Sequence, residues 1–194
     1  MSISVDPPTD ALIVVDVQRD FCPGGALAVP RGDEVVPVIN RLLVLTDWLT
    51  VATRDWHPAD HCSFRTQGGI WPPHCVAGTD GAAFHPALDR ARIHHVVSKA
   101  VTRDSEAYSG FQGTDLAALL ARRGIRRAFV CGLATDYCVK ATALDARRAG
   151  LDVVVFEDAI RGVEVKPGDC AKAIDEMRAS AIVLAPSADL TPPH

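Results

Sequence analysis

Six short runs of apolar, largely β-branched residues recur along the chain without alternating polar positions. A continuous apolar run of this length is typical of a strand buried on both faces, as in a parallel sheet. The runs are Ala11 to Val15, Leu49 to Thr53, Ile93 to Ser98, Arg127 to Gly132, Leu151 to Phe156 and Ala181 to Ala185. The pattern therefore predicts six buried parallel strands.

Helical spacing of apolar positions, flanked by residues that favour helix ends, separates several of these runs. The predicted helices are Glu34 to Trp48, Asp115 to Arg123, Asp136 to Ala149 and Asp169 to Ala179. Alternating strands and helices predict an α/β fold with right-handed crossovers. We expect a three-layer, doubly wound sandwich around a mainly parallel six-stranded sheet with strand order 3-2-1-4-5-6.

The length of 194 residues and the apolar content of 48% suit a single domain over residues 1–194. The stretch 54–92 departs from the regular pattern, because it is rich in proline and glycine and has little periodicity. Long loops inside a compact domain are usually functional. Ligands bind outside the carboxyl ends of the strands in such sheets, so we expect this loop and those strand ends to form one site.

The formal charge of −4 and the isoelectric point near 5.9 provide no basic field for nucleic acid or an anionic membrane. No apolar run is long enough to cross a bilayer, and the first residues lack a basic segment followed by an apolar one. The six cysteines show no CxxC spacing, which favours reduced thiols. These features predict a soluble, cytoplasmic protein.

Cys138 is the leading candidate nucleophile, because it lies in the first turn of a predicted helix that follows an apolar run. Unpaired N–H groups and the helix dipole favour a thiolate there, so the pKa of Cys138 should fall. The alternative is that Cys138 is a small buried hydrophobe. Asp16 and Lys99 close two other apolar runs, which puts three ionisable residues at the carboxyl ends of three predicted strands.

These three residues could perform acyl transfer. Asp16 could take the thiol proton, Lys99 could supply a positive charge, and the N–H groups of Ala134 and Cys138 could face an oxyanion. The alternatives are a strand-end aspartate that caps a turn and a solvated lysine.

The long loop holds a second group of candidate residues, in Asp55-Trp56-His57, Asp60-His61 and Trp71-Pro72-Pro73-His74. Carboxylates and imidazoles are ligands for zinc, iron or manganese. Surface histidines and a loop-capping aspartate are the alternative interpretation. The aromatic residues Phe21, Trp71, Tyr108 and Tyr137 could line a flat pocket or pack in the core.

Seven ordered segments carry a family resemblance that runs from about Ala11 to about Ala185. They are Asp16 to Phe21, Pro23 to Val29, Thr53 to Pro58, Trp71 to Cys75, Lys99, Tyr108 to Phe111 and Gly132 to Val139. In these segments the chain resembles the nicotinamidase/pyrazinamidase branch of the isochorismatase-like cysteine hydrolases. The resemblance implies hydrolysis of nicotinamide, and of pyrazinamide, to the acid and ammonia through a cysteine thioester, in NAD salvage.

The resemblance also implies roles for individual residues. Cys138, Asp16 and Lys99 would form the catalytic triad. A cis peptide bond between Leu133 and Ala134 would turn the Ala134 N–H group into an oxyanion hole shared with Cys138. The expected substrate-binding residues are Phe21, Trp71, Tyr108, Leu133 and Tyr137.

One divalent metal ion is implied, with zinc as the first choice and iron or manganese as alternatives. Its ligands would be Asp55, His57 and His74, and it would coordinate the ring nitrogen of the substrate. His61 aligns with a histidine that is a ligand in some members only, and Ser63 is a candidate for contact with a metal-bound water.

Three other functions stay open at this stage. The first is an amidohydrolase of the same superfamily with an N-carbamoyl or ureido substrate, since such relatives share the triad but not the metal ligands. The second is a metallohydrolase in which the ion activates water and Cys138 is structural. The third is a binding module without catalysis. A small-molecule substrate is the expected partner, and a homo-oligomer is left open.

Overall fold

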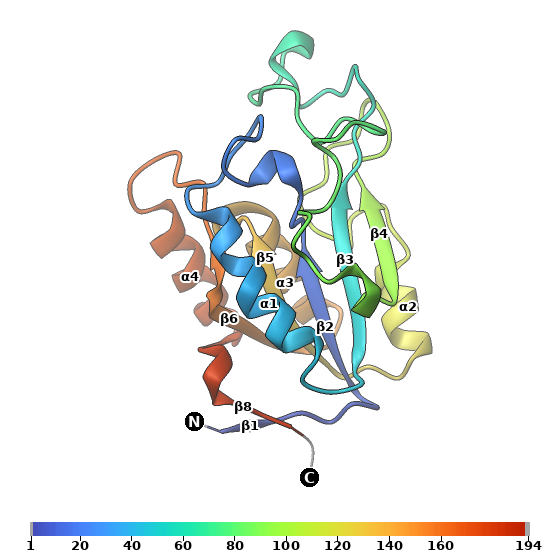
Figure 1. Cartoon of the computed structure of the whole chain (residues 1–194), viewed down its shortest axis with the longest axis vertical. Coiled ribbons are helices and arrows are strands. Elements are labelled where there is room, and N and C mark those ends of the chain that lie inside the picture. Colours follow the sequence, from blue (N-terminus) through green and yellow to red (C-terminus); the bar gives the residue numbers. More distant parts are fainter. Residues whose placement is uncertain (1, 193–194) are drawn as a thin grey trace.

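A computed structural model describes residues 2–192, and a six-stranded sheet with helices on both faces forms its centre (Figure 1). Every neighbouring pair of strands in this sheet is parallel, and the order is β4-β3-β2-β5-β6-β7. The strands are β2 (Asp10–Val15), β3 (Leu49–Asp55), β4 (His95–Lys99), β5 (Arg127–Leu133), β6 (Asp152–Arg161) and β7 (Val183–Ala185). This confirms the predicted order 3-2-1-4-5-6, and the sheet is parallel throughout.

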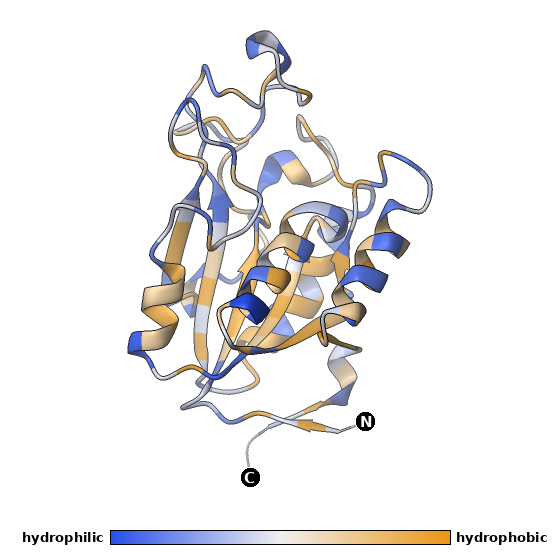
Figure 2. Cartoon of the chain, turned by 180° about the vertical axis from the view of Figure 1, so that it is seen from behind, coloured by the Kyte–Doolittle hydropathy of each residue, from blue (hydrophilic) through white to orange (hydrophobic). Residues whose placement is uncertain are grey.

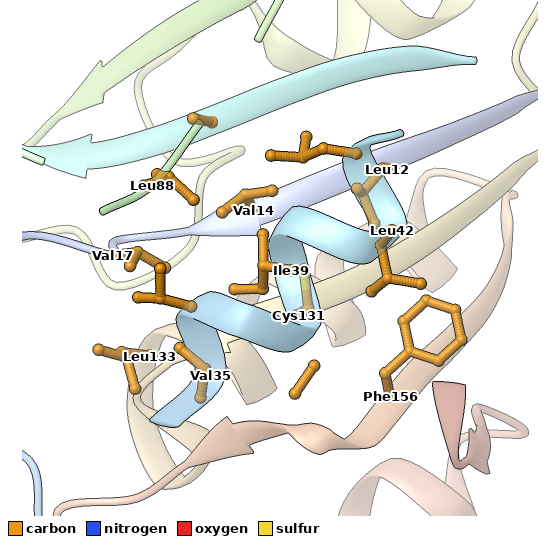
Figure 3. Packing of buried hydrophobic residues seen from close by; sticks show 14 of the residues in the cluster. Leu12, Val14, Val17, Val35, Ile39, Leu42, Leu88, Cys131, Leu133 and Phe156 are labelled. Carbon is orange, nitrogen blue, oxygen red and sulfur yellow. The ribbon is translucent and has the colours of Figure 1, made fainter. Parts of the chain in front are cut away.

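The two faces of the sheet are covered by different helices. Helix α1 (Val35–Leu43) packs on one face, where Leu12 and Val14 of β2 point toward it (Figure 3). Ile13 of β2 points to the opposite face, because successive side chains of a strand alternate. That face is covered by α2 (Leu116–Arg122), α3 (Lys140–Arg148) and α4 (Asp169–Ala179). Figure 2 shows the hydrophobic strands at the centre and the hydrophilic residues of the helices and loops around them.

Short helical turns and a small second sheet complete the fold. The 3-10 helices are η1 (Arg19–Phe21), η2 (Gly32–Glu34), η3 (Arg65–Gln67), η4 (Arg90–Arg92) and η6 (Ser187–Asp189), and η5 (Thr135–Val139) is a π-helix. Strands β1 (Ile3–Ser4) and β8 (Leu190–Thr191) pair in parallel near the two ends of the chain, which the apolar pattern did not predict. No helix among residues 2–192 is long and apolar enough to span a membrane.

Two predicted helices differ in their boundaries. Helix α1 ends at Leu43 rather than at Trp48, because the Trp48 ring turns into the core against Phe129, with ring centroids 5.3 Å apart. The predicted helix from Asp136 begins as the π-helical turn η5 before α3. The long loop lies between β3 and β4, on the side of the sheet where the strands end (Figure 1).

Candidate active site

Asp16, Lys99 and Cys138 meet at the carboxyl ends of the strands. Asp16 directly follows β2, Lys99 is the last residue of β4, and Cys138 lies in the helical turn η5 after β5. Lys99 Nζ is 3.0 Å from Asp16 Oδ2 and 3.5 Å from Cys138 Sγ. All three residues are buried. The three strand-end groups singled out in the sequence therefore form one cluster.

The backbone around this cluster takes conformations that fix its geometry. Gly132 has a φ of +117°, and a Cβ atom there would lie 2.1 Å from the carbonyl oxygen of Val15. Only glycine fits this close approach of β5 to the end of β2. Asp16 has a φ of 48°, in the left-handed region, so the chain turns at the residue that carries the carboxylate. The peptide bond between Leu133 and Ala134 is cis.

Lys99 is an ammonium held between two carboxylates. Its Nζ atom also donates to Asp55 Oδ1 and, at 3.1 Å, to the carbonyl oxygen of Ala107. Burial by itself would lower the pKa of Lys99, but Asp16 and Asp55 together raise that pKa well above its ordinary value. The positive charge is thus permanent at neutral pH, and it faces the sulfur of Cys138.

The pKa of Asp16 is raised above its ordinary value of 3.8. Burial is the largest cause; the Lys99 charge and a hydrogen bond of 2.7 Å from Thr53 Oγ1 to Oδ1 act in the opposite direction. Among the described residues, Asp16 Oδ2 accepts no hydrogen bond of good geometry. This oxygen is therefore available to accept a proton from the neighbouring thiol.

The expectation of a lowered pKa for Cys138 is wrong. Burial raises the pKa of the thiol well above 9.0; Lys99 lowers it, and the nearby Asp16 and Asp55 carboxylates add to the increase. The positive end of a helix does not outweigh the cost of placing a thiolate in a buried site beside two carboxylates. A raised pKa favours the neutral thiol, so a base beside the sulfur must take its proton as the sulfur attacks.

Asp55, His57 and His74 form a second cluster beside the first. Their ligand atoms all lie within 4.8 Å of one another, and Asp55 Oδ2 is 3.5 Å from His57 Nε2 and 3.9 Å from His74 Nε2. The Nδ1 atom of His57 lies 3.2 Å from the carbonyl oxygen of Ala100, and that of His74 lies 2.8 Å from Pro72 O. Because a carbonyl only accepts, both rings carry the proton on Nδ1 and turn a free Nε2 toward Asp55.

This arrangement fits a divalent metal ion. His57 Nε2 is buried and has no hydrogen-bond partner within residues 2–192, which is costly unless a ligand occupies the site. Burial lowers the pKa of His74, which favours the neutral imidazole that metals require. One carboxylate oxygen and two imidazole nitrogens are a common donor set for zinc and other borderline metals.

His61 is not brought into this set. Its Nε2 atom lies 3.2 Å from the carbonyl oxygen of Ser105, and its Nδ1 atom lies 2.8 Å from Ser63 Oγ. Both ring nitrogens are therefore occupied, and the ring lies 4.2 Å from that of His57, measured between centroids. His61 supports the His57 ring by packing, and Ser63 orients His61.

Gln18 is a supporting residue that the sequence interpretation missed. Its fully buried side chain donates to the carbonyl oxygens of Asp55 (2.8 Å) and Ala82 (2.9 Å), and it accepts from the Asp55 N–H at 2.8 Å. The amide thus continues the strand pairing beyond the end of β2 and fixes the backbone of Asp55. The only sign of this role in the sequence is a glutamine two residues after a strand-end aspartate. That spacing does not show that the glutamine binds the backbone of Asp55.

A narrow pocket opens onto both clusters. Eleven residues line it: Phe21, Leu27, Asp55, Trp71, His74, Glu106, Tyr108, Ala134, Tyr137, Cys138 and Val163. Trp71 Nε1 donates to the Tyr108 hydroxyl at 3.0 Å, and the Trp71 and Tyr137 rings meet edge to face at 81°. Four of the five expected substrate-binding residues are therefore in the pocket wall.

Leu133 is the exception. It is fully buried and packs in the core beneath α1, beside Val35 (Figure 3), rather than in the pocket lining. The reason is the alternation of side chains along β5, which turns Leu133 to the α1 face.

Three lining residues were absent from the sequence interpretation, namely Leu27, Glu106 and Val163. Val163 follows β6, which extends further than predicted, to Arg161. Asp136 fixes this segment, since its carboxylate accepts from the N–H groups of Val163 and Glu164 at 2.9 and 2.8 Å. No periodic signal marks such a residue, because the contact depends on a loop conformation.

Comparison with known families gives a match of residues 10–189 to the Isochorismatase domain. The chain belongs to the isochorismatase family. Relatives named nicotinamidase in Escherichia coli and nicotinamidase/pyrazinamidase in Mycobacterium tuberculosis are 42% and 44% identical to it. The first alignment covers 94% of this chain and 97% of the relative, and the second covers 90% and 97%.

Several solved structures are similar to this protein over most of the chain. A protein from L. infantum in complex with nicotinate has a TM-score of 0.95 at 41% identity, with 99% of this chain and 100% of that chain covered. The pyrazinamidase of Pyrococcus horikoshii in complex with zinc has a TM-score of 0.86 at 50% identity, with 92% and 99% covered. The N-carbamoylsarcosine amidase from Thermoplasma acidophilum is less similar, with a TM-score of 0.74 at 28% identity and coverage of 92% and 96%.

Proposed function

We propose that this isochorismatase-family protein is a nicotinamidase that hydrolyses nicotinamide, and pyrazinamide, to the carboxylic acid and ammonia in NAD salvage. The observation that carries this proposal is the pocket, whose wall contains Cys138 together with Asp55 and His74 of the other cluster. A flat pyridine carboxamide can place its amide carbon at the sulfur and its ring nitrogen toward that cluster. Relatives that share more than 40% of their residues with this chain carry the name nicotinamidase.

The first half of the reaction forms a thioester. Asp16 accepts the proton of the Cys138 thiol, and the sulfur attacks the amide carbon while Lys99 stabilises the negative charges around it. The N–H groups of Ala134 and Cys138 hold the tetrahedral oxyanion. Protonated Asp16 then gives its proton to the departing nitrogen, which leaves as ammonia.

The second half releases the acid. Asp16 takes a proton from a water molecule and the resulting nucleophile attacks the thioester. The carbon–sulfur bond then breaks as Asp16 returns that proton to the departing sulfur, which restores the Cys138 thiol. A carboxyl group whose pKa is raised by burial suits both steps, because it can hold a proton and release it within one turnover.

Asp55, His57 and His74 would hold one divalent metal ion, for which zinc is our first choice and iron or manganese the alternatives. Such an ion would supply a Lewis-acid contact for the ring nitrogen, which would orient the substrate. Phe21 and Trp71 are proposed to hold the two faces of the ring, with Tyr108 and Tyr137 beside them. We also propose that residues 1–194 act as one catalytic domain in the cytoplasm.

The proposal is tested by measuring ammonia release from nicotinamide with the metal-loaded protein, with and without a chelator. We expect turnover that the chelator removes and zinc restores, together with an acyl adduct on Cys138 detected by mass spectrometry after rapid quenching. Turnover of N-carbamoylsarcosine in place of nicotinamide would contradict the proposed substrate. If no adduct forms and the protein stays active after the Cys138 thiol is removed, the results would favour a mechanism in which the metal ion activates water.

A further inference from the structure

Glu106 occupies an unusual place in the pocket wall. It precedes Tyr108 by two residues, in the connection between β4 and α2, and is half-buried. Its Oε1 atom accepts from the N–H group of Ala107 at 3.0 Å, and the carbonyl oxygen of Ala107 accepts from Lys99 Nζ at 3.1 Å. The segment that carries Glu106 is therefore tied directly to the catalytic cluster, and the carboxylate is held at the pocket.

Among the described residues, no basic side chain compensates the charge of Glu106. Only two of the eleven lining residues, Asp55 and Glu106, are acidic, and Asp55 is paired with Lys99 and faces two histidines. Glu106 forms no ion pair with any residue in the range 2–192. Its field nevertheless reaches the facing wall, since burial raises the pKa of Tyr108 and the Glu106 charge adds to that increase.

The rest of the lining offers little to screen such a charge. Phe21, Leu27, Trp71, Ala134 and Val163 contribute apolar surface. Electrostatic interactions are stronger in a narrow, apolar pocket than in open water. A second negative charge brought into this pocket is therefore repelled by Glu106, whereas a neutral ligand is not.

We propose that Glu106 is a specificity-determining residue that weakens binding of the anionic acid product relative to the neutral amide substrate. The inference rests on the proposed function, because hydrolysis of a carboxamide is the step that creates the anion. The substrate enters uncharged, and the reaction leaves a carboxylate in the same pocket as the Glu106 carboxylate. This repulsion favours departure of the acid and limits product inhibition.

The test compares the wild-type protein with Glu106→Gln, which keeps the shape of the side chain and removes its charge. We expect the inhibition constant of nicotinate to fall about 3- to 10-fold, the scale of one partly screened charge pair, while KM for nicotinamide changes less than about twofold. High salt should reduce the difference between the two proteins. Glu106→Asp keeps the charge and should retain most of the discrimination.

Asp104→Asn is the matched control, since it changes the net charge by the same amount in the same segment, but its side chain is 90% exposed. It should alter neither constant. If Glu106→Gln changes KM and the nicotinate inhibition constant equally, Glu106 lines the pocket without discriminating between substrate and product, and the inference is overturned. It is also overturned if neither constant changes. Direct titration of the wild-type protein separates the two proposals: if neither nicotinamide nor nicotinate binds, the proposed function fails as well.

Discussion

The two clusters of the site are built by different means. Asp16 is fixed by the central strand β2 that it follows, Lys99 by the edge strand β4 that it ends, and Cys138 by the turn that follows β5. His57 and His74 lie instead on irregular chain, where backbone carbonyl oxygens hold one nitrogen of each ring. Regular elements thus position the groups proposed to react, whereas the loop positions the groups proposed to orient the substrate.

Asp55 belongs to both clusters. It is the last residue of β3, and its Oδ1 atom accepts from Lys99 while its Oδ2 atom faces the two histidines. Burial by itself would raise the pKa of Asp55, but the Lys99 charge holds that pKa well below its ordinary value. One carboxylate therefore links the two clusters, and separating their contributions requires variants on either side of it.

The largest effect is expected from Cys138→Ala. Loss of the nucleophile should reduce kcat by a factor on the order of 10⁴ or more, because no other group can form the thioester. Metal content, measured by elemental analysis, should be unchanged, since the proposed metal ligands are Asp55, His57 and His74. Cys62→Ala is the control, because it removes a half-buried thiol of the long loop and should keep full activity. Substantial turnover by Cys138→Ala would refute covalent catalysis.

His74→Ala tests the other side of the comparison. We expect loss of tightly bound metal and a decrease in kcat/KM of at least about a hundredfold, carried mainly by KM, because the ring of the substrate is no longer oriented. Alkylation of Cys138 by iodoacetamide should continue at a rate close to that of the wild-type protein. His85→Ala, a half-buried histidine outside the cluster, should change neither property. A wild-type KM with no metal bound would show that the ion does not orient the substrate.

Gln18→Leu weakens the connection between the clusters. The substitution removes three hydrogen bonds and leaves the buried N–H and carbonyl groups of Asp55 without their partner. We expect a loss of about 2 to 4 kcal/mol in the free energy of unfolding and a metal affinity lower by about tenfold. Chemical denaturation and competition with a chelator measure the two effects.

Asn40→Leu provides the control for this change. The Asn40 amide also binds backbone groups through both of its polar atoms, since it donates to the carbonyl oxygen of Ala87 and accepts from the N–H group of Asp89. These contacts lie away from the site. It should lose some stability and keep its metal affinity. If both variants lose metal affinity equally, the effect of Gln18 is a general loss of stability rather than positioning of Asp55.

The division between regular elements and irregular loops also explains which parts of the structure could be predicted from the sequence. The strands and their order follow from buried apolar runs, and Asp16 and Lys99 could be placed because each closes such a run. The apolar pattern predicts that Asp55 lies in the long loop, whereas it is the last residue of β3. Residues whose positions depend on loop conformation, such as Glu106 and Val163, leave no periodic trace. The resemblance supplied the metal ligands, but it could not reveal that burial raises the pKa of Cys138, because burial at a strand end depends on what the loops cover.

The smallest effect is expected from Thr53→Val, which probes the proton-transfer group without touching the nucleophile. The Thr53 hydroxyl donates to Asp16 Oδ1 and lowers the pKa of that carboxyl, so removing it should raise an already raised pKa further. Asp16 must be ionised to act as a base, and the acid limb of the kcat/KM profile should therefore move to higher pH. Thr50→Val is the control, since Thr50 is buried in the same strand but donates to Arg92 instead.

Stability should change with pH in the matching direction. Because the pKa of Asp16 in the folded protein is above 3.8, its contribution to stability is fully present below that pH and is lost as pH rises through the folded value. Thr53→Val should enlarge this loss, so its melting temperature should fall further below that of the wild-type protein at neutral pH than at acid pH. If Thr53→Val lowers the melting temperature equally at every pH and leaves the acid limb of the kcat/KM profile unmoved, a group other than Asp16 accepts the thiol proton.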